Sequence, residues 1–176
     1  MNRFRRLLLR TIALTSLLSP ALFSHAAEAP LKPRPPVEIP DSRGGFGTLL
    51  VDDQKRRLLL AHTGNATLDV IDLNTEKLVK QIKIGPATGL VLDVAKDRYY
   101  ISAGREKKLV TIDRDKLEVI SEFELPGPVE GLTLGPSGVN RVFVGHAEST
   151  NLWVIDPTAK TIASTLLVPA GPTAIV

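Results

Sequence analysis

Two histidines occupy equivalent positions in repeated runs of the sequence and are candidates for holding a metal. His62 ends the run Arg57-Leu-Leu-Leu-Ala-His62 and His146 ends Arg141-Val-Phe-Val-Gly-His146, whereas Ala103 ends the third run of this kind. Zinc binds imidazole nitrogen at about 2.1 Å, so one shared ion would require both side chains to reach a common axis. The two histidines are 84 residues apart, on different copies of the repeat. We interpret them as strand-end residues that face a loop. Partial ligation of a haem or metal held by a partner is the alternative.

Three aspartates recur in the same way, each directly after an isoleucine. They are Asp72, Asp113 and Asp156. Two carboxylates separated by about 5 to 10 Å can perform acid–base catalysis together, but these three belong to separate copies of the repeat. A carboxylate at the end of a strand more often accepts backbone N–H groups in the following turn. We predict this turn-capping role for all three.

The other recurrent or conspicuous residues favour structural roles. The arginines that open the repeated runs are predicted to pack turns or neighbouring repeats together; they are Arg57, Arg98 and Arg141. Trp153 alternates onto the same strand face as Ile155 and is predicted to pack inside the repeat. Glu130 and Glu148 stand near strand ends, where they could line the mouth of a channel.

Two short basic turns raise the question of nucleic-acid binding: Lys55-Arg56-Arg57 and Arg105-Glu-Lys-Lys108. Proteins that bind single-stranded DNA combine basic side chains with aromatic stacking platforms. Aromatic residues make up only 5% of this chain. Tyr99 and Tyr100 lie near Arg98, but Tyr100 is expected in the core. These residues therefore argue against a nucleic-acid surface.

The sequence lacks the familiar motifs of catalysis and cofactor binding. It contains no nucleophile elbow, no phosphate-binding glycine loop and no cluster of metal ligands. Gly44-Gly45-Phe-Gly47 is rich in glycine but lacks the lysine and the following helix of a phosphate cradle. The absence of cysteine excludes disulfides and thiolate sites. We therefore predict no catalytic, cofactor-binding or metal-binding residue, and no cofactor.

The elements that position these residues are copies of one unit. Gly47, Gly89 and Gly131 fall at equal intervals of 42 residues. After each glycine come a strand-like run, an Arg-led run, a run ending in Ile-Asp, and a more polar run. About four short strands per unit, with a period in the low forties, are typical of propeller blades. The sequence predicts an all-β fold, a partial β-propeller of about three four-stranded antiparallel blades plus the start of a fourth.

The boundaries of the units follow from the Gly-Pro pairs that close them. We expect blades at 44–85, 86–127 and 128–171, and a truncated fourth blade beginning at 172–176. The first strands are expected at 48–52, 90–94 and 132–134, and the fourth strands at 78–84, 117–125 and 161–168. The fourth runs are the least apolar, so we expect the outermost strand of each blade to be exposed along its edge.

The repeated runs resemble the YVTN-type β-propeller repeat. The resemblance rests on the Arg-x-aromatic-Val run, the x-Val-Ile-Asp run and the Gly-Pro-x-x-Gly opening, and it covers 44–176. It departs from that pattern at Ala103 and the two histidines, where an asparagine is common. The resemblance implies a YncE-like periplasmic or cell-surface protein, for which single-stranded DNA binding and association with redox or metal-uptake systems are further implications. Such proteins usually form seven blades, so this chain is expected to be a fragment of a longer ring.

The N-terminal residues are predicted to direct export. Residues 1–26 combine four arginines, a short apolar stretch and the small residues Ser24-His25-Ala26 of a cleavable signal peptide. Its apolar stretch is too short to span a bilayer. Residues 27–43 form a proline-rich leader that is expected to be extended. Without the signal, 18 basic side chains face 19 acidic ones, which removes any general attraction to nucleic acid or anionic lipid. The predicted location is the periplasm or outside the cell.

These patterns favour a non-catalytic binding or interaction platform. The predicted partners are a protein or a small molecule at the blade loops or the central channel, and self-association through open blade faces is a further expectation. The alternative function is the propeller part of a periplasmic enzyme, a lactonase-like hydrolase or a dehydrogenase subunit. Its site residues would then come partly from blades that are missing here.

Overall fold

A computed structural model describes residues 33–146 and 148–169. The chain divides into two units, Met1–Pro35 and Pro36–Val176, and all the strands given below lie in the second. The predicted signal peptide, residues 27–32 of the leader and the predicted start of a fourth blade fall outside the described residues. Within the described part of the chain, no helix has the length and apolar character needed to cross a membrane.

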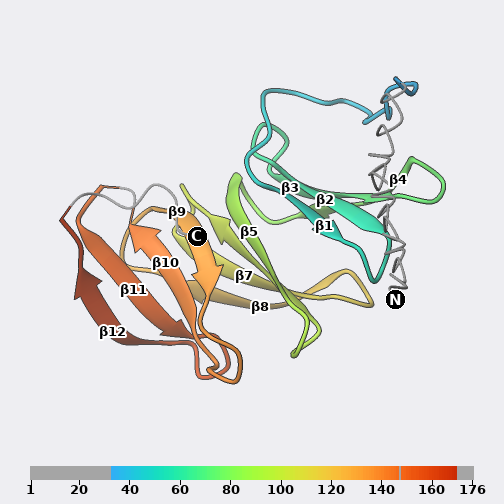
Figure 1. The fold of residues 1–176 in the computed structure, drawn as a ribbon. Helices are drawn as coiled ribbons and strands as arrows, with labels where there is room; N and C mark the ends of the chain where they lie inside the picture. The colour runs from blue at the N-terminus through green and yellow to red at the C-terminus, as the bar shows by residue number, and fades with distance from the viewer. Residues whose placement is uncertain (1–32, 147, 170–176) are drawn as a thin grey trace, which may run out of the picture. The chain divides into compact units, whose positions relative to one another are not determined.

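Twelve strands form three separate four-stranded antiparallel sheets, as the sequence predicted (Figure 1). Each sheet follows chain order, so every strand pairs with its sequence neighbour, and each falls within the range expected for one blade. We call β1–β4 blade 1, β5–β8 blade 2 and β9–β12 blade 3. The strands are β1 Leu49–Asp52, β2 Arg57–His62, β3 Thr67–Asp72, β4 Lys77–Lys83, β5 Ala87–Asp93, β6 Arg98–Ala103, β7 Lys108–Asp113, β8 Glu118–Glu124, β9 Val129–Leu134, β10 Val142–His146, β11 Asn151–Asp156 and β12 Thr161–Leu167. This arrangement is a partial β-propeller.

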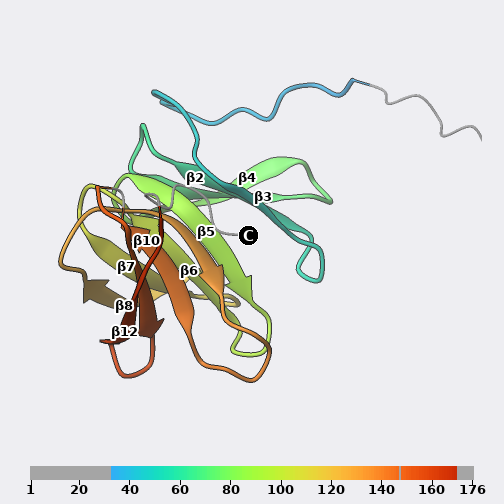
Figure 2. The ribbon, with the colours of Figure 1, turned by 60° about the vertical axis from the view of Figure 1, so that its left-hand side comes forward.

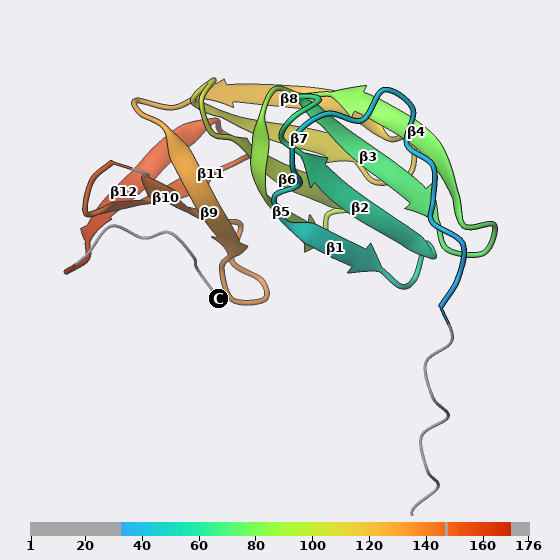
Figure 3. The same ribbon diagram turned by 90° about the horizontal axis from the view of Figure 1, so that it is seen from above.

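The core consists of two apolar layers, one between each pair of neighbouring blades. Figure 3 shows the three blades following one another in chain order. The layer between blades 1 and 2, which we call seam 1, includes Leu59, Val70 and Ile101. The layer between blades 2 and 3, seam 2, includes Tyr100 and Trp153. The second and third strands carry most of the buried side chains of each blade.

The outermost strands β4, β8 and β12 are largely exposed, which confirms the expectation from their polar composition. Each also carries one extra residue at the same point of its register, opposite the third strand. The extra residues are Val79, Ile120 and Ala163. A bulge of this kind bends and twists the edge of a sheet, and it was not foreseen from the sequence.

The registers correct the assumed equivalence of the three glycines. Leu90 pairs with Ile101 and Leu132 with Val144, and the matching pair in blade 1 is Leu49 with Leu60. Gly89 and Gly131 therefore precede equivalent leucines directly, whereas Gly47 lies one residue earlier. The true spacing is 41 residues from Arg57 to Arg98 and 43 from Arg98 to Arg141. One of the two additional residues lies in the longer turn between the first two strands of blade 3.

Two further corrections concern the strand starts and the leader. Strands β5 and β9 begin three residues earlier than expected, directly after the Gly-Pro pairs. The described part of the leader forms no strand, as expected. Its last residues stay exposed but contact the protein: the segment 42–46 lies against blade 1, with Arg43 hydrogen-bonded to Asn65 (2.9 Å). Figure 2 shows this segment, in blue, meeting blade 1 before β1 begins.

Candidate functional site

The recurrent aspartates at the ends of β3, β7 and β11 cap turns, as predicted. Asp72 Oδ1 accepts the backbone N–H groups of Asn74 and Thr75 at 2.8 and 2.7 Å. Asp113 and Asp156 each accept two N–H groups at 3.0 Å in the equivalent turns. These backbone hydrogen bonds stabilise the ionised form and lower the pKa of all three carboxyl groups. Each carboxylate therefore stabilises the turn that follows its own strand.

The recurrent arginines pack the same turns, and one of them crosses seam 1. Arg98 lies 3.3 Å from Asp113, and Arg141 lies 2.9 Å from Asp156. Arg57 instead donates to the backbone carbonyl of Arg114 in blade 2, at 2.6 Å. The structural role predicted for these three residues is confirmed.

His62 ends β2 and faces the segment 42–46, which forms no strand, as predicted for a strand-end residue that faces a loop. Its ring is fully buried beneath the segment 42–46, with the Phe46 ring centroid 4.3 Å away. Nδ1 lies 2.7 Å from Asp69 Oδ2, and Nε2 lies 3.0 Å from the carbonyl oxygen of Arg43. Thr67 and Gln81 donate to the other carboxylate oxygen of Asp69. Both ring nitrogens thus have acceptor partners inside the protein.

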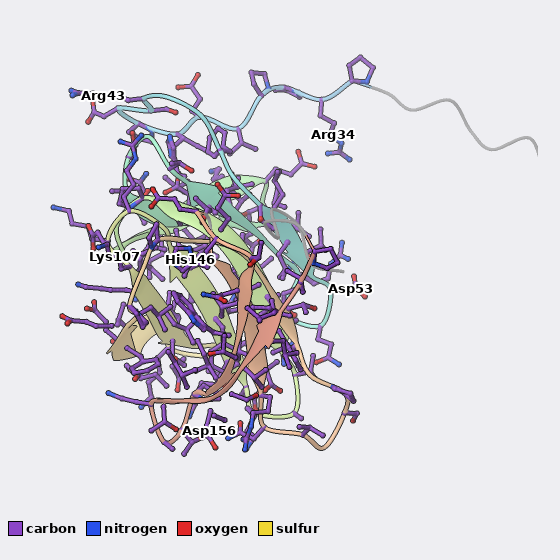
Figure 4. The ribbon with its side chains drawn as sticks, turned by 90° about the vertical axis from the view of Figure 1, so that its left-hand side faces the viewer. Arg34, Arg43, Asp53, Lys107, His146 and Asp156 are labelled. Carbon is purple, nitrogen blue, oxygen red and sulfur yellow. The ribbon has the colours of Figure 1, made fainter. Side chains whose placement is uncertain are left out.

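His146 occupies the equivalent place at the end of β10 but has different partners. Its ring packs edge-on against Trp153 with centroids 4.8 Å apart, and its Nδ1 accepts the backbone N–H of Glu148 at 3.1 Å. Trp153 is 5% exposed and packs in seam 2, as predicted. In Figure 4 His146 and Asp156 lie at opposite ends of blade 3. In the ranges 33–146 and 148–169, no three His, Asp or Glu side chains are grouped to hold a metal ion.

The predicted channel residues and aromatic residues have mostly structural surroundings. The backbone carbonyl of Glu130 accepts hydrogen bonds from Ser102 and Thr88, which joins the inner strands of blades 2 and 3. Glu148 is exposed. Tyr100 is buried in seam 2, as expected.

The strongest polar cluster lies in seam 1 and was missed by the sequence analysis. Arg114 donates from Nε and Nη2 to the two oxygens of Asp52, each at 2.7 Å, and Tyr99 donates to Asp52 Oδ2 at 2.5 Å. Asp97 and Gln54 accept further hydrogen bonds from Arg114. The hydrogen bonds from Arg114 lower the pKa of Asp52 to about 2, and burial together with Asp52 raises the pKa of Tyr99 to about 12.

Seam 2 lacks this cluster because two of its three members are replaced. The registers make Asp93 the counterpart of Asp52, Val142 that of Tyr99, and Pro157 that of Arg114. Pro157 now lines a hollow of about 280 Å³ between blades 2 and 3. A second hollow of about 520 Å³ lies beside the turns 92–96 and 134–141 of the same two blades, and Lys96 lines both.

The smaller hollow is the candidate ligand site. Three basic residues line it: Lys96, Arg98 and Lys160. Four hydroxyl side chains join them, from Tyr100, Thr111, Ser121 and Thr158. Arg98 is held in place by Asp113 and by the carbonyl of Asp97. The site thus presents cations and hydroxyl groups, with no acidic residue in its lining. Blade 3 departs from blade 2 at three consecutive positions of this turn: Pro157, Thr158 and Ala159 replace Arg114, Asp115 and Lys116. These replacements are the sequence signal from which the hollow could have been predicted.

Comparison with known proteins supports the fold and nothing finer. No family model matches the sequence, and no curated protein matches it. The chain is similar in structure to hydrazine synthase from Kuenenia stuttgartiensis, with a TM-score of 0.63 and 13% identity over 72% of this chain and 37% of that one. It is also similar to U3-55K, with a TM-score of 0.62 and 11% identity over 74% of this chain and 42% of the other.

These structural similarities support the assignment of the fold and do not indicate a function. The present chain spans less than half the length of either structure, and both identities are too low to transfer a site. In all, 671 chains of known structure share the likeness, so the architecture does not select a function, which must be argued from the hollow itself.

Proposed function

We propose that this chain is part of an exported, non-catalytic β-propeller protein that acts as a binding module. The resemblance of its repeated runs to the YVTN-type, YncE-like repeat supports the assignment to periplasmic or cell-surface propellers. The arginine-rich, apolar residues 1–26 support export. A protein or small-molecule ligand is the proposed partner.

One observation carries the binding role: the smaller hollow of seam 2. The recurrent aspartates and arginines that suggested chemistry are engaged in turns of their own blades. Basic and hydroxyl side chains line the hollow at seam 2. At the matching place in seam 1, the side chain of Arg114 occupies the space between the blades. Concave sites with a few convergent polar groups are the usual places for small ligands.

Export is tested by expressing the full chain with a C-terminal tag in a Gram-negative host and sequencing the N-terminus of the periplasmic product. The expected mature protein begins at Ala27. Recovery of the uncleaved chain in the cytoplasm would refute the export part of the proposal.

The enzymatic alternative is tested on the same purified protein. A series of lactones is incubated with it, with and without a metal chelator, and hydrolysis is followed by titration of released acid. No turnover above the rate without protein is expected. Hydrolysis that is abolished by the chelator and by Glu130→Gln would replace the binding module with a hydrolase.

Single-stranded DNA is the remaining candidate partner, because the family resemblance implies it. A labelled oligonucleotide is titrated against the protein at two salt concentrations. Binding that weakens steeply as salt rises would support a nucleic-acid surface, since contacts to phosphates release counterions. Absent or salt-independent binding would remove it.

A further inference from the structure

Seam 1 is closed by three contacts that run from blade 1 to the turn after β7. Lys55 forms an ion pair with Asp115 at 2.5 Å. Lys80 Nζ donates to the carbonyl of Lys116 at 3.2 Å, and Arg57 donates to the carbonyl of Arg114 at 2.6 Å. These contacts, together with the Arg114 side chain, fill the space between the two blades.

None of these three contacts recurs in the described residues of seam 2. Lys96 corresponds to Lys55, but Thr158 stands where Asp115 would pair with it. Ser121 occupies the register position of Lys80, opposite Thr111, and its side chain is too short to cross the seam. Arg98 corresponds to Arg57, and it donates within its own blade, to Asp97 and Asp113. The hollow of about 280 Å³ occupies the position that these contacts close at seam 1.

The charge of the hollow follows from these replacements. In residues 33–146 and 148–169, neither Lys96 nor Lys160 has an acidic group within ion-pair distance. Three acidic groups adjoin the lining without belonging to it. Asp156, directly before Pro157, is paired with Arg141 at 2.9 Å. Asp113 is paired with Arg98, and Asp93 lines the larger hollow, where it accepts the backbone N–H of Lys96 at 3.1 Å.

Two of the hydroxyl groups that line the hollow belong to residues that are themselves largely buried. Tyr100 is 3% exposed and Thr111 is 8% exposed. In the part of the chain that the structure describes, no hydrogen bond is formed by either hydroxyl group, although both residues line the hollow. Neither oxygen is a buried unsatisfied atom, so each is accessible from the hollow that its residue lines. Both hydroxyl groups are therefore free to donate to a ligand in the hollow.

We propose that this hollow binds the phosphate group of a small organic phosphate. A phosphate dianion offers three terminal oxygens, which can accept hydrogen bonds from Arg98, Lys96 and Lys160 and from the hydroxyl groups that line the hollow. Hydrogen bonds between ionised partners are the strong ones, and arginine recognises phosphate with a fixed planar fork. A volume of about 280 Å³ holds a phosphate with a short polyol or sugar. The inference rests on the proposed function only in treating the chain as a binding module.

The test is isothermal titration of the full exported chain with glycerol 3-phosphate, with glycerol and inorganic phosphate as matched probes. The wild-type protein is expected to bind glycerol 3-phosphate and inorganic phosphate but not glycerol. The double variant Lys96→Gln/Lys160→Gln should weaken binding at least about tenfold, as expected on loss of two charge-assisted hydrogen bonds. Lys55→Gln, the matching change at seam 1, should leave the affinity unchanged.

A second variant separates charge from folding. Thr158→Asp restores the acidic partner of seam 1 opposite Lys96 and retains an acceptor for Asn140 Nδ2, which now donates to Thr158 at 3.1 Å. It should abolish phosphate binding while leaving the melting temperature equal to or above that of the wild type. Equal phosphate affinity in wild type, Thr158→Asp and the double variant would overturn the inference, as would the absence of binding.

The outcomes also distinguish this inference from the proposed function. Export without phosphate binding overturns only the ligand assignment. Release of inorganic phosphate from glycerol 3-phosphate by the protein would instead overturn the non-catalytic function. Binding of a dinucleotide phosphodiester in preference to glycerol 3-phosphate, with the same response to the variants, would reassign the site to nucleic acid and contradict the small-molecule proposal.

Discussion

Arg114 and Asp52 join blades 1 and 2 through two parallel hydrogen bonds of 2.7 Å, with side chains that are 3% and 0% exposed. Neither residue recurs with its partner at seam 2, where Pro157 replaces the arginine. Both seams contain an apolar layer, but seam 1 adds a buried ion pair, whereas seam 2 contains a hollow.

Replacing Arg114 by methionine should strongly destabilise the protein. The change leaves Asp52 as an uncompensated charge in a buried site, and removing one partner of a buried pair typically costs about 3 to 5 kcal/mol. Lys55→Gln breaks the exposed pair with Asp115 and should cost at most about 1 kcal/mol. Urea unfolding of both variants and the wild type measures the difference. Equal effects of the two substitutions would contradict a buried ion pair.

The same aspartate predicts a loss of stability in acid. Its pKa is lowered from 3.8 to about 2 in the folded protein, mainly by the hydrogen bonds from Arg114. A carboxyl group whose pKa is lower in the folded state than in the unfolded state stabilises the folded state at pH values above its unfolded pKa. This contribution disappears as the pH falls from 3.8 to about 2. The free energy of unfolding of Asp52→Asn should therefore fall less steeply over this window than that of the wild type. Asp53→Asn, at an exposed position, should follow the wild type.

Replacing His62 by glutamine should release the segment 42–46 from blade 1. His62 links Asp69 to the carbonyl of Arg43, and a buried acceptor without its donor costs about 1 to 3 kcal/mol. Trypsin should then cut after Arg43 at least about fivefold faster, as followed by mass spectrometry of the cleaved product. His146→Gln, at the equivalent end of β10, should leave this cleavage rate unchanged. No change in the His62 variant would show that other contacts hold the segment.

Adding a methyl group at Gly89 should separate the inner strands of blades 2 and 3. A Cβ at this position would lie 2.4 Å from Leu132 Cδ2 and 2.7 Å from the carbonyl oxygen of Glu130. Overpacking of this kind typically costs about 1 to 3 kcal/mol. Gly45→Ala is the control, since nothing lies within 4 Å of its added Cβ. Thermal unfolding should show a lower midpoint for Gly89→Ala alone.

The blades and their turn residues were accessible from the sequence because both depend on local patterns. Four strands per unit follow from short apolar runs between turn residues, and the capping by Asp72 follows from the chemistry of a carboxylate two or three residues before backbone donors. Exposure of the fourth strands follows from their polar composition.

The features that distinguish one seam from another were not accessible in this way. The pairing of Arg114 with Asp52 joins residues 62 positions apart. It also depends on the alignment of blade 1 with blade 2, and the equal spacing of the glycines predicted this alignment one residue away from the observed register. The burial of His62 depends on the leader crossing blade 1, which its proline-rich composition did not predict. Bulges at Val79, Ile120 and Ala163 have no local sequence signal here.

Those three bulges have a consequence for how blades meet other molecules. A foreign strand that aligned with β4, β8 or β12 would match the hydrogen-bonding groups on one side of the extra residue and fall out of step on the other. Lateral growth into fibrils along these edges is therefore blocked by backbone geometry, even where the side chains, such as Val79 and Ile120, are apolar and exposed.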